Sequence, residues 1–288
     1  MDILITGILL GATYALLAMG LTLQYGVARI MNLANGEMLV AGAFGAFWVA
    51  TTQQLSPYLA LLFVVPGAFV LNWLVYRLLL TPLVRRAKHR GMLEVDSILA
   101  TFGMSFALVG VMLTIFGGEF FTYSYLAVPF TISGSPFGLN RVVACGVAVL
   151  VCGLLYLGLN ATRPGMAIRA VAVDPGAASL VAIDVPRMSA FAFALGGAVT
   201  AIGGVVLSTF LTLDASIGVL FTMKALIIVI MGGVGDVRGA VVAALVLGLA
   251  ETAVASLIDP GLTLAAAYLL FVLVLLFRPQ GLFGRRTS

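Results

Sequence analysis

Long apolar runs, separated by short polar or basic segments, occupy nearly the whole chain. A helix needs about 20 apolar residues to cross a bilayer, and most of the runs approach that length. The second and seventh are shorter, and each is interpreted either as a full span or as a broken or re-entrant element. The pattern predicts an all-α fold, a polytopic membrane helix bundle of eight or nine transmembrane segments. The candidate spans are Ile3–Gln24, Glu37–Thr52, Tyr58–Tyr76, Ser97–Gly117, Val142–Asn160, Met188–Leu211, Val219–Val234, Gly239–Leu257 and Leu262–Phe277.

The composition indicates a membrane protein and excludes a soluble one. Hydrophobic residues make up 62% of the 288 residues, charged residues make up 9%, and the mean hydropathy is +1.19. An average soluble domain carries about 25% charged residues. Lipid must therefore solvate much of the surface, and we expect residues 1–288 to form a single transmembrane domain. The apolar start lacks a basic leader, so it is expected to be the first span and not a cleaved signal peptide.

The basic residues are distributed unevenly about the predicted spans. If nine spans end with a cytoplasmic C-terminus, thirteen Lys and Arg residues lie on the cytoplasmic side, only Arg141 lies outside, and Lys224 falls within a span. Such an excess is typical of cytoplasmic loops. We therefore expect a multi-pass protein of the bacterial inner membrane with its N-terminus outside, and no nucleic-acid partner. The thirteen are Arg29, Arg77, Arg85, Arg86, Lys88, Arg90, Arg163, Arg169, Arg187, Arg238, Arg278, Arg285 and Arg286.

Few residues suggest catalysis or metal binding. Cys145 and Cys152 lie in one apolar run and indicate neither a disulfide framework nor a metal site, and His89 lies in a basic loop without an evident partner. The sequence has no Gly-rich phosphate-binding loop that ends in Lys and Ser or Thr. Nothing resembles a catalytic triad or a pair of catalytic carboxylates. The chain is therefore predicted not to be an enzyme and to bind no metal or cofactor itself.

Two loops are candidate contact sites for other proteins. The aromatic segment 118–140 is the longest outer loop, which either receives a soluble partner or only caps the bundle. In the cytoplasmic segment 162–187, Asp174 is a predicted N-cap for a helix over Pro175–Ile183 that Pro186 stops. A compact helix of this kind suits mechanical coupling to a cytosolic motor, and an ordinary capped loop explains the same residues. The candidate coupling residues are Arg163, Arg169, Asp174, Ala177, Ala178, Leu180 and Ile183.

Polar residues interrupt two of the apolar runs. Asn35 is predicted to cap a helix that begins at Gly36, and Glu37 then lies in its first turn, where the helix dipole favours an acid. A polar break that lines a translocation pathway explains the same residues. The segment 232–236 has a similar layout, which makes it a candidate internal repeat. The candidate pathway residues are Asn32, Asn35, Glu37, Gly232, Gly233, Asp236 and Glu251.

Lys224 and Glu251 are the two charged residues inside apolar spans. Counted from the outer ends of neighbouring antiparallel spans, both lie about 8–11 Å deep. Because charges inside a membrane usually pair, the two residues are a candidate intramembrane ion pair. Two other interpretations are open: Glu251 binds the ammonium group of a solute, or Lys224 extends to the outer interface.

Four segments, in order along the chain, carry a family resemblance. They are GLTLQYGVARIMNLANGE (20–37), ATRPGMAIRAVAVDPGAASLVAIDVPR (161–187), KALIIVIMGGVGDVRGA with LGLAE (224–251), and RPQGLFG (278–284). Together they resemble the branched-chain (hydrophobic) amino acid ABC importer permease family, and of its two permeases the one with fewer spans. The family has His at the position of Asn35, and Ser and Pro at those of Asp236 and Arg238. These differences bear on which solute is carried.

The resemblance implies a transport subunit for a small polar solute, most of all for branched-chain or other hydrophobic amino acids. It implies two cytosolic ABC ATPase subunits that hold ATP and Mg, a second permease subunit and an extracytoplasmic substrate-binding protein. It also implies that the segment 162–187 docks on the ATPase, so a bulky charged residue at Ala177 or Ala178 should block docking and spare the fold. The alternative is a secondary transporter or channel for a solute such as urea or an amide.

Overall fold

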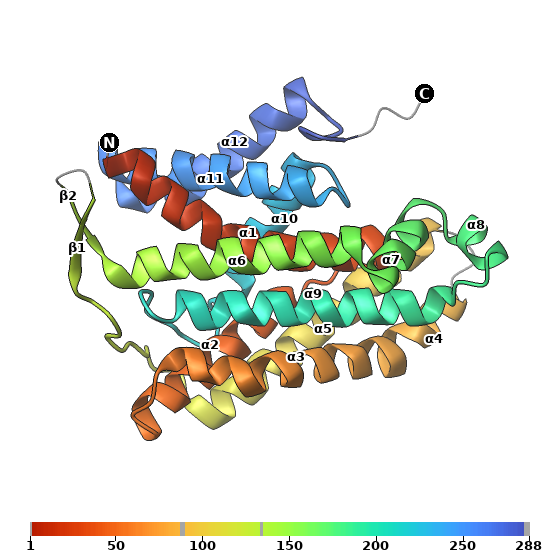
Figure 1. Cartoon of the computed structure of the whole chain (residues 1–288), viewed down its shortest axis with the longest axis horizontal. Helices are drawn as coiled ribbons and strands as arrows, with labels where there is room; N and C mark the ends of the chain where they lie inside the picture. Colours follow the sequence, from red (N-terminus) through yellow and green to blue (C-terminus); the bar gives the residue numbers. More distant parts are fainter. Residues whose placement is uncertain (1, 87–89, 133–134, 285–288) are drawn as a thin grey trace.

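The computed structural model describes residues 2–86, 90–132 and 135–284 as a bundle of helices (Figure 1). One end of the bundle carries the N-terminus and the strands β1 and β2, and we call it the hairpin end. The other end carries α4, α7 and α8, and we call it the coupling end. The predictions that concern Lys88, His89, Arg285 and Arg286 lie outside the described residues.

Within the described residues, seven helices are long and apolar enough to cross a membrane. One is a continuous stretch, Pro57–Arg86, that contains α3 (Leu61–Val75), a π-helical turn (Tyr76–Leu80) and α4 (Thr81–Arg86). The others are α1 (Asp2–Ala28), α5 (Arg90–Phe116), α6 (Leu139–Ala161), α9 (Val185–Leu207), α11 (Val237–Leu257), and α12 (Thr263–Phe277) together with the 3-10 turn Pro260–Leu262 before it.

Two shorter apolar helices occupy the second and seventh predicted runs. They are α2 (Asn35–Thr52) and α10 (Gly218–Gly232), of 18 and 15 residues. At 1.5 Å per residue they rise about 27 and 22 Å, less than the roughly 30 Å of a hydrocarbon core. A membrane helix bundle is therefore confirmed, but a count of eight or nine crossings is not, because it depends on these two helices.

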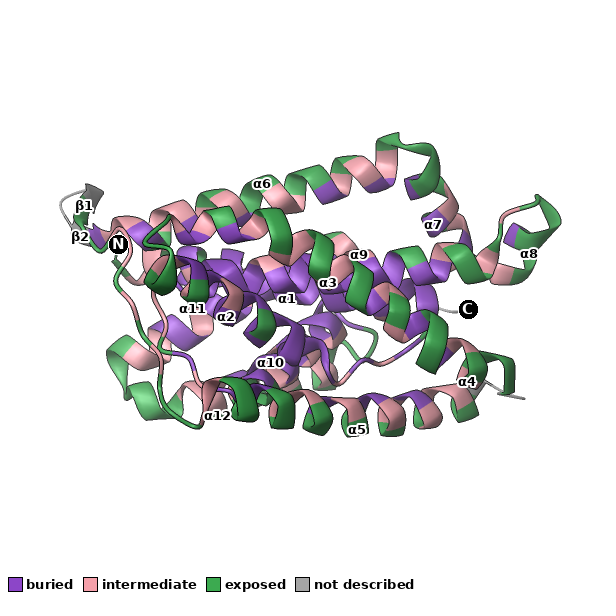
Figure 2. Cartoon of the chain, turned by 90° about the horizontal axis from the view of Figure 1, so that it is seen from below, coloured by how far each residue is buried: buried purple, intermediate pink, exposed green. Residues whose placement is uncertain are grey.

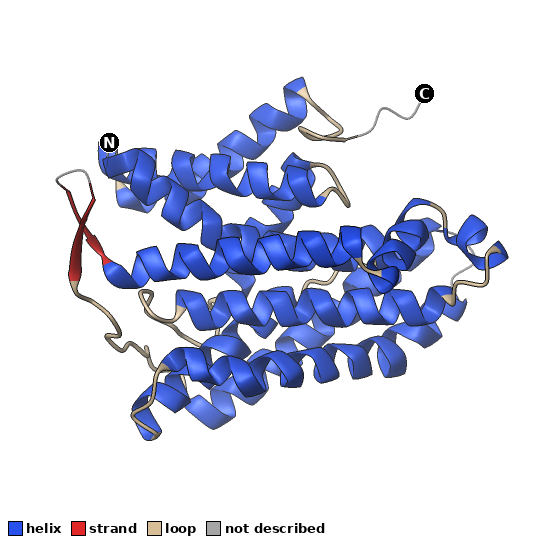
Figure 3. Cartoon of the chain, in the orientation of Figure 1, coloured by secondary structure: helices blue, strands red, loops and turns tan. Residues whose placement is uncertain are grey.

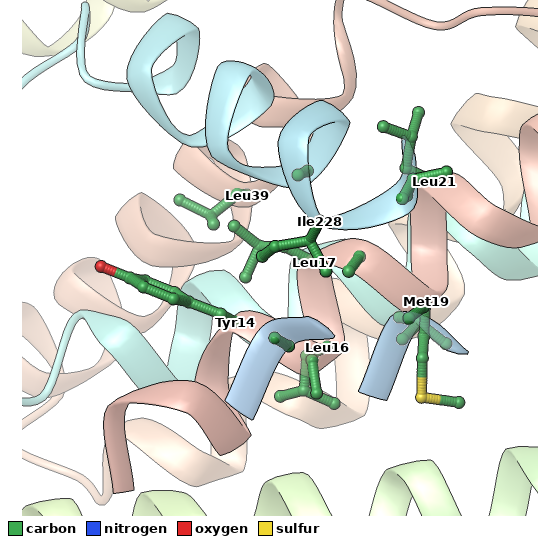
Figure 4. Packing of buried hydrophobic residues seen from close by; sticks show 14 of the residues in the cluster. Tyr14, Leu16, Leu17, Met19, Leu21, Leu39 and Ile228 are labelled. Carbon is green, nitrogen blue, oxygen red and sulfur yellow. The ribbon is translucent and has the colours of Figure 1, made fainter. Parts of the chain in front are cut away.

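Helices α1 and α9 form the centre of the bundle (Figure 2). The membrane-crossing window of α9 is 83% buried and that of α1 is 67% buried, whereas that of α12 is only 6% buried. Glycines permit the close packing: a Cβ atom on Gly20 would lie 2.5 Å from the backbone oxygen of Gly196. In lipid the hydrophobic effect does not drive helices together, so the close packing that small residues permit holds them together instead. Leu17, Leu39 and Ile228, from three helices, fill the adjoining core (Figure 4).

The all-α prediction omits one antiparallel hairpin, β1 (Pro129–Ile132) with β2 (Ser135–Gly138), in the loop between α5 and α6 (Figure 3). The same loop is tied to the bundle, because Phe121 and Leu213 exchange two backbone hydrogen bonds of 2.8 Å. The hydroxyl of Tyr123 lies 2.7 Å from that of Ser208, and burial raises the pKa of Tyr123 to about 12. Capping of the bundle by this loop is thus present in the structure.

The segment 162–187 forms α7 (Arg163–Val173) and α8 (Pro175–Leu180) at the coupling end. Asp174 caps α8 as predicted, since its Oδ1 accepts hydrogen bonds from the amides of Gly176 and Ala177. The predicted end at Ile183 is wrong. The helix stops at Leu180 because Ala182 takes a left-handed conformation with φ +60°. Pro186 does not stop α8 but lies in the first turn of α9.

Candidate functional site

The chain break between α1 and α2 is closed by its own polar side chains. Asn32 Oδ1 accepts a hydrogen bond from the amide of Ala34 at 3.1 Å, and Asn32 Nδ2 donates to Gln24 Oε1 at 2.9 Å. The predicted cap by Asn35 is wrong, because α2 begins at Asn35 itself after Ala34, without a side-chain cap. Asn35 Oδ1 instead accepts a hydrogen bond from Thr200 Oγ1 of α9 at 3.0 Å. Asn35 thus joins α2 to the centre of the bundle.

A free backbone amide in the first turn of α2 is hydrogen-bonded by a side chain of a second helix. The amide of Gly36 donates to Thr222 Oγ1 of α10 at 2.8 Å. A Cβ atom on Gly36 would lie 1.8 Å from the backbone oxygen of Gly218, so only glycine fits here. The N-terminal turns of α2 and α10 therefore meet. Each helix N-terminus carries about half a positive charge from its free amides.

Glu37 lies at this meeting point and is fully buried. Its Oε1 accepts a hydrogen bond from Ser105 Oγ of α5 at 3.0 Å. A Cβ atom on Gly218 would lie 2.6 Å from Glu37 Oε2, so the carboxylate also faces the start of α10. Oε2 has no hydrogen-bond partner among the described residues. Two helix N-termini and one hydroxyl thus surround a carboxylate whose second oxygen is unused.

The break lies deep within the bundle. Ser105 is the sixteenth residue of α5, so Glu37 lies about 22 Å along a helix about 40 Å long. One helical turn closer to the start of α5 than Ser105, Thr101 Oγ1 contacts the backbone of Met31 and Leu33, each at 3.1 Å. Irregular backbone at such depth requires protein or water around it, and here protein groups supply the contacts.

A hydroxyl-bearing face of α5 was not predicted. Ser97, Thr101 and Ser105 are four residues apart and buried, whereas most of the rest of α5 is exposed or half-buried. Residues four apart share a helix face, so this spacing was a usable signal in the sequence. Two of the three residues hold the break and Glu37 in place.

The candidate residues Gly232, Gly233 and Asp236 do not join the Glu37 cluster. They lie at the opposite end of α10, in the turn before α11, where Asp236 Oδ1 accepts a hydrogen bond from the amide of Gly239 at 2.8 Å. The amides of Leu282 and Phe283 donate to the last carbonyls of α10 at 2.7 and 3.0 Å. The second break is therefore a capped turn that the C-terminal segment covers.

The predicted ion pair is present. Lys224 Nζ lies 2.8 Å from Glu251 Oε2, and Glu251 is 3% exposed. Tyr14 of α1, which was not predicted, completes the group: its hydroxyl lies 2.7 Å from both Glu251 Oε2 and Lys224 Nζ. Lys224 therefore points to Glu251 and does not extend to an interface. The group connects α1, α10 and α11.

The coupling residues divide into buried and exposed ones. Ile168 and Val171 fix α7 to the core, and Arg29 donates to the carbonyl of Ala172 at 3.0 Å. Beyond that anchor, α8 projects from the bundle, and Leu180 and Val181 are 87% and 69% exposed. The other candidates are distributed as follows: Arg163, Arg169, Asp174 and Ala177 are exposed, Ile183 is half-buried and Ala178 is buried.

Ala178 is only 3% exposed and packs in the hydrophobic core. A charged residue there would disturb the fold as well as docking, so the expectation that it spares the fold is wrong for this position. Ala177 is exposed, as that expectation requires. Leu180 and Val181 are better positions for a docking test, because their side chains leave the bundle.

We expect Thr222→Val to lower the free energy of unfolding by about 1–3 kcal/mol, because the buried amide of Gly36 loses its acceptor. Denaturant titration of the purified protein in detergent measures this loss. Thr114→Val is the matched control, since its exposed hydroxyl bonds only to carbonyls of its own helix. Equal losses for the two variants would contradict the role given to Thr222.

The fold has a counterpart among solved structures. The structure described as PsaBC from Streptococcus pneumoniae in complex with Fab aligns with a TM-score of 0.50 at 11% identity, and covers 98% of this chain and 94% of that one. At this identity the likeness concerns the fold alone.

Sequence comparison goes further. The high-affinity branched-chain amino acid transport system permease protein LivH of Salmonella typhimurium is 30% identical over 97% of this chain and 94% of its own. The corresponding protein BraD of Pseudomonas aeruginosa is 31% identical over 98% of this chain and 95% of its own. Residues 3–277 match the family described as branched-chain amino acid transport system, permease component. The chain therefore belongs to the family of branched-chain amino acid transport system permeases.

Proposed function

We propose that this chain is the pore-forming permease of an ATP-driven importer and carries branched-chain or other hydrophobic amino acids. The observation that carries the proposal is the family match over residues 3–277. The matched residues include helix α8, which projects from the coupling end (Figure 1) and is therefore suited to contact with a cytosolic motor. The relatives' names supply the solute class, branched-chain amino acids.

The proposed assembly contains two cytosolic ABC ATPase subunits, which hold ATP and Mg, a second permease and an extracytoplasmic binding protein. Leu180 and Val181 are the proposed contacts with the ATPase, because they are the exposed apolar residues at the end of α8. Closure of the ATPases would push on α8. The anchor of α7, including the bond from Arg29 to Ala172, would pass that push to the break before Glu37.

We propose that the break between α1 and α2 borders the translocation pathway. The support is its composition and depth: Asn32, Asn35 and Glu37 lie with hydroxyl side chains far inside an apolar bundle. Charged residues inside membranes usually face a bundle interior or a pathway. We further propose that α2 and α10 also cross the membrane. Together with the seven longer spans they give nine crossings.

Nine crossings would put the two termini on opposite sides of the membrane, and we propose that the N-terminus lies outside a bacterial cell and the C-terminus in its cytoplasm. The support is the basic character of the coupling end, where Arg85, Arg86, Arg163 and Arg169 lie. Cysteines introduced at Asp259, before α12, and at Ser179, in α8, test this orientation. A membrane-impermeant reagent applied to intact cells should label the first and not the second; the reverse pattern excludes the orientation.

Purification of the tagged chain from its native membrane tests the proposed function. We expect an ATPase subunit to copurify, with ATP hydrolysis stimulated by the binding protein loaded with leucine. A thermal-shift screen of that binding protein against amino acids, amides and urea then identifies the solute. A chain that purifies without any ATPase, and that binds solute without a binding protein, would favour a secondary transporter instead.

A further inference from the structure

A basic pocket of about 370 Å³ lies where the helix stretch Pro57–Arg86 ends. It is separate from the Glu37 cluster, the ion pair and α8, and none of those sites uses its residues. The stretch is buried over only 11% of its membrane-crossing window, so most of it faces outward from the bundle. The pocket is lined by Arg77, Thr81, Pro82, Arg85 and Arg86.

The local helix geometry brings these side chains together. Arg77, Thr81 and Arg85 are four residues apart, so they share a helix face. The stretch is π-helical at Tyr76–Leu80, and Thr81 Oγ1 donates to the carbonyl of Tyr76 at 2.9 Å. Single π-helical turns inside α-helices occur frequently at functional sites.

Among the described residues, no acid forms a salt bridge with an arginine of the pocket. The described residues contain the salt bridges Arg187–Asp184 and Lys224–Glu251, and neither includes an arginine of the pocket. Arg77 lies over the ring of Trp73, with its guanidinium carbon 5.0 Å from the ring centre. Tryptophan is enriched at the level of lipid headgroups, so this contact indicates the depth of Arg77.

The surroundings are those of a membrane interface. One turn or less from Arg77, Leu74 and Leu78 are 40% and 73% exposed, although both are apolar. The outward face therefore changes from leucine to arginine within a few residues. A ligand that suits both parts has hydrocarbon chains beside the leucines and a phosphate beside the guanidinium groups, which bind phosphate with two parallel hydrogen bonds.

We propose that this pocket binds the phosphodiester headgroup of an anionic phospholipid, in the leaflet at the coupling end. Arg77 and Arg85 hold the phosphate, and the acyl chains follow α3 past Leu78 and Leu74. Basic pockets at the cytoplasmic ends of membrane helices suit such headgroups. A lipid bound there would fix the end of α3 at the interface.

Native mass spectrometry of the full chain in detergent tests this proposal, with titration by phosphatidylglycerol and by phosphatidylcholine of identical acyl chains. We expect a tight first site for phosphatidylglycerol only. The double variant Arg77→Gln, Arg85→Gln should weaken that site about 100-fold, since the loss of each charge-assisted hydrogen bond to the phosphate weakens binding about tenfold or more. The matched control is Arg163→Gln with Arg278→Gln, which removes two exposed arginines at the same end but outside the pocket.

The control should change the phosphatidylglycerol affinity less than about threefold, as expected for loss of general charge without loss of a site. Equal weakening by the two double variants would overturn the proposal, as would equal affinity for the two lipids. Displacement of phosphatidylglycerol by millimolar inorganic phosphate would show a site for soluble phosphate and would also overturn it. Unchanged melting temperatures show that both double variants remain folded.

Discussion

The double variant Leu180→Glu, Val181→Glu is expected to lose ATPase binding while the membrane bundle stays folded. Both side chains project from the end of α8, 87% and 69% exposed, and have no role in the core. Full burial of a Leu or Val side chain contributes about 1.5–3 kcal/mol, so the loss of one of them weakens association roughly 10- to 150-fold. Pull-down of the purified ATPase, with ATP hydrolysis measured in the same preparation, gives the result.

The matched control is Leu257→Glu with Ile258→Glu at the hairpin end. These side chains are apolar, adjacent and 73% and 70% exposed, so the chemical change and the exposure are nearly the same. We expect the control to bind ATPase normally. Normal ATPase binding by the α8 variant, or equal loss in both variants, would show that α8 is not the docking element.

The second large effect concerns Lys224 and Glu251. Lys224→Met leaves Glu251 buried without its cation, and Glu251→Gln leaves Lys224 without its anion. Breaking a buried pair in this way typically costs about 3–5 kcal/mol. We expect each single variant to lose about that much free energy of unfolding, and the double variant to lose clearly less than the sum. Denaturant titration in detergent measures all three.

Arg187→Gln is the control for this pair, because it breaks the exposed contact with Asp184. Exposed ion pairs contribute little, so a nearly unchanged unfolding curve is expected. Additive losses for Lys224→Met and Glu251→Gln would show that the two side chains do not interact. Tyr14→Phe should weaken the group further, because the tyrosine hydroxyl contacts both charged atoms.

The sequence predicted the elements whose cause is local. Each apolar run became a helix, because a chain in lipid must satisfy its own backbone groups. Asp174 caps α8 through amides two and three residues away, so the chain order alone contains that information. The pairing of Lys224 with Glu251 was also predictable, since a helix rises a constant 1.5 Å per residue and the two residues were counted to similar positions on neighbouring spans.

Long-range contacts account for what the sequence did not predict. Asn35 was expected to cap α2, but Thr200 bonds its side chain from 165 residues away. Thr222, 186 residues along the chain, satisfies the amide of Gly36 instead. Tyr14 lies 237 residues from Glu251, and no local pattern marks it as part of the ion pair. The positions of these partners depend on how the helices pack.

The predicted boundary of α8 and the missing hairpin were wrong for a different reason. Helix α8 stops at Leu180 because Ala182 is left-handed, although nothing in its residue type favours that conformation. The hairpin of β1 and β2 lies in a segment rich in glycine, proline and aromatic residues, which favours a loop as much as two short strands. In both places the tertiary structure determined the backbone.

Uptake of radiolabelled leucine into proteoliposomes tests the central claim most directly. The vesicles contain this chain with the proposed second permease and ATPase subunits, and the proposed binding protein is supplied on the opposite side. The account predicts uptake when ATP is present on the ATPase side, no uptake with ADP, and none with the Leu180→Glu, Val181→Glu variant. Uptake driven by a proton or sodium gradient without ATP would contradict it.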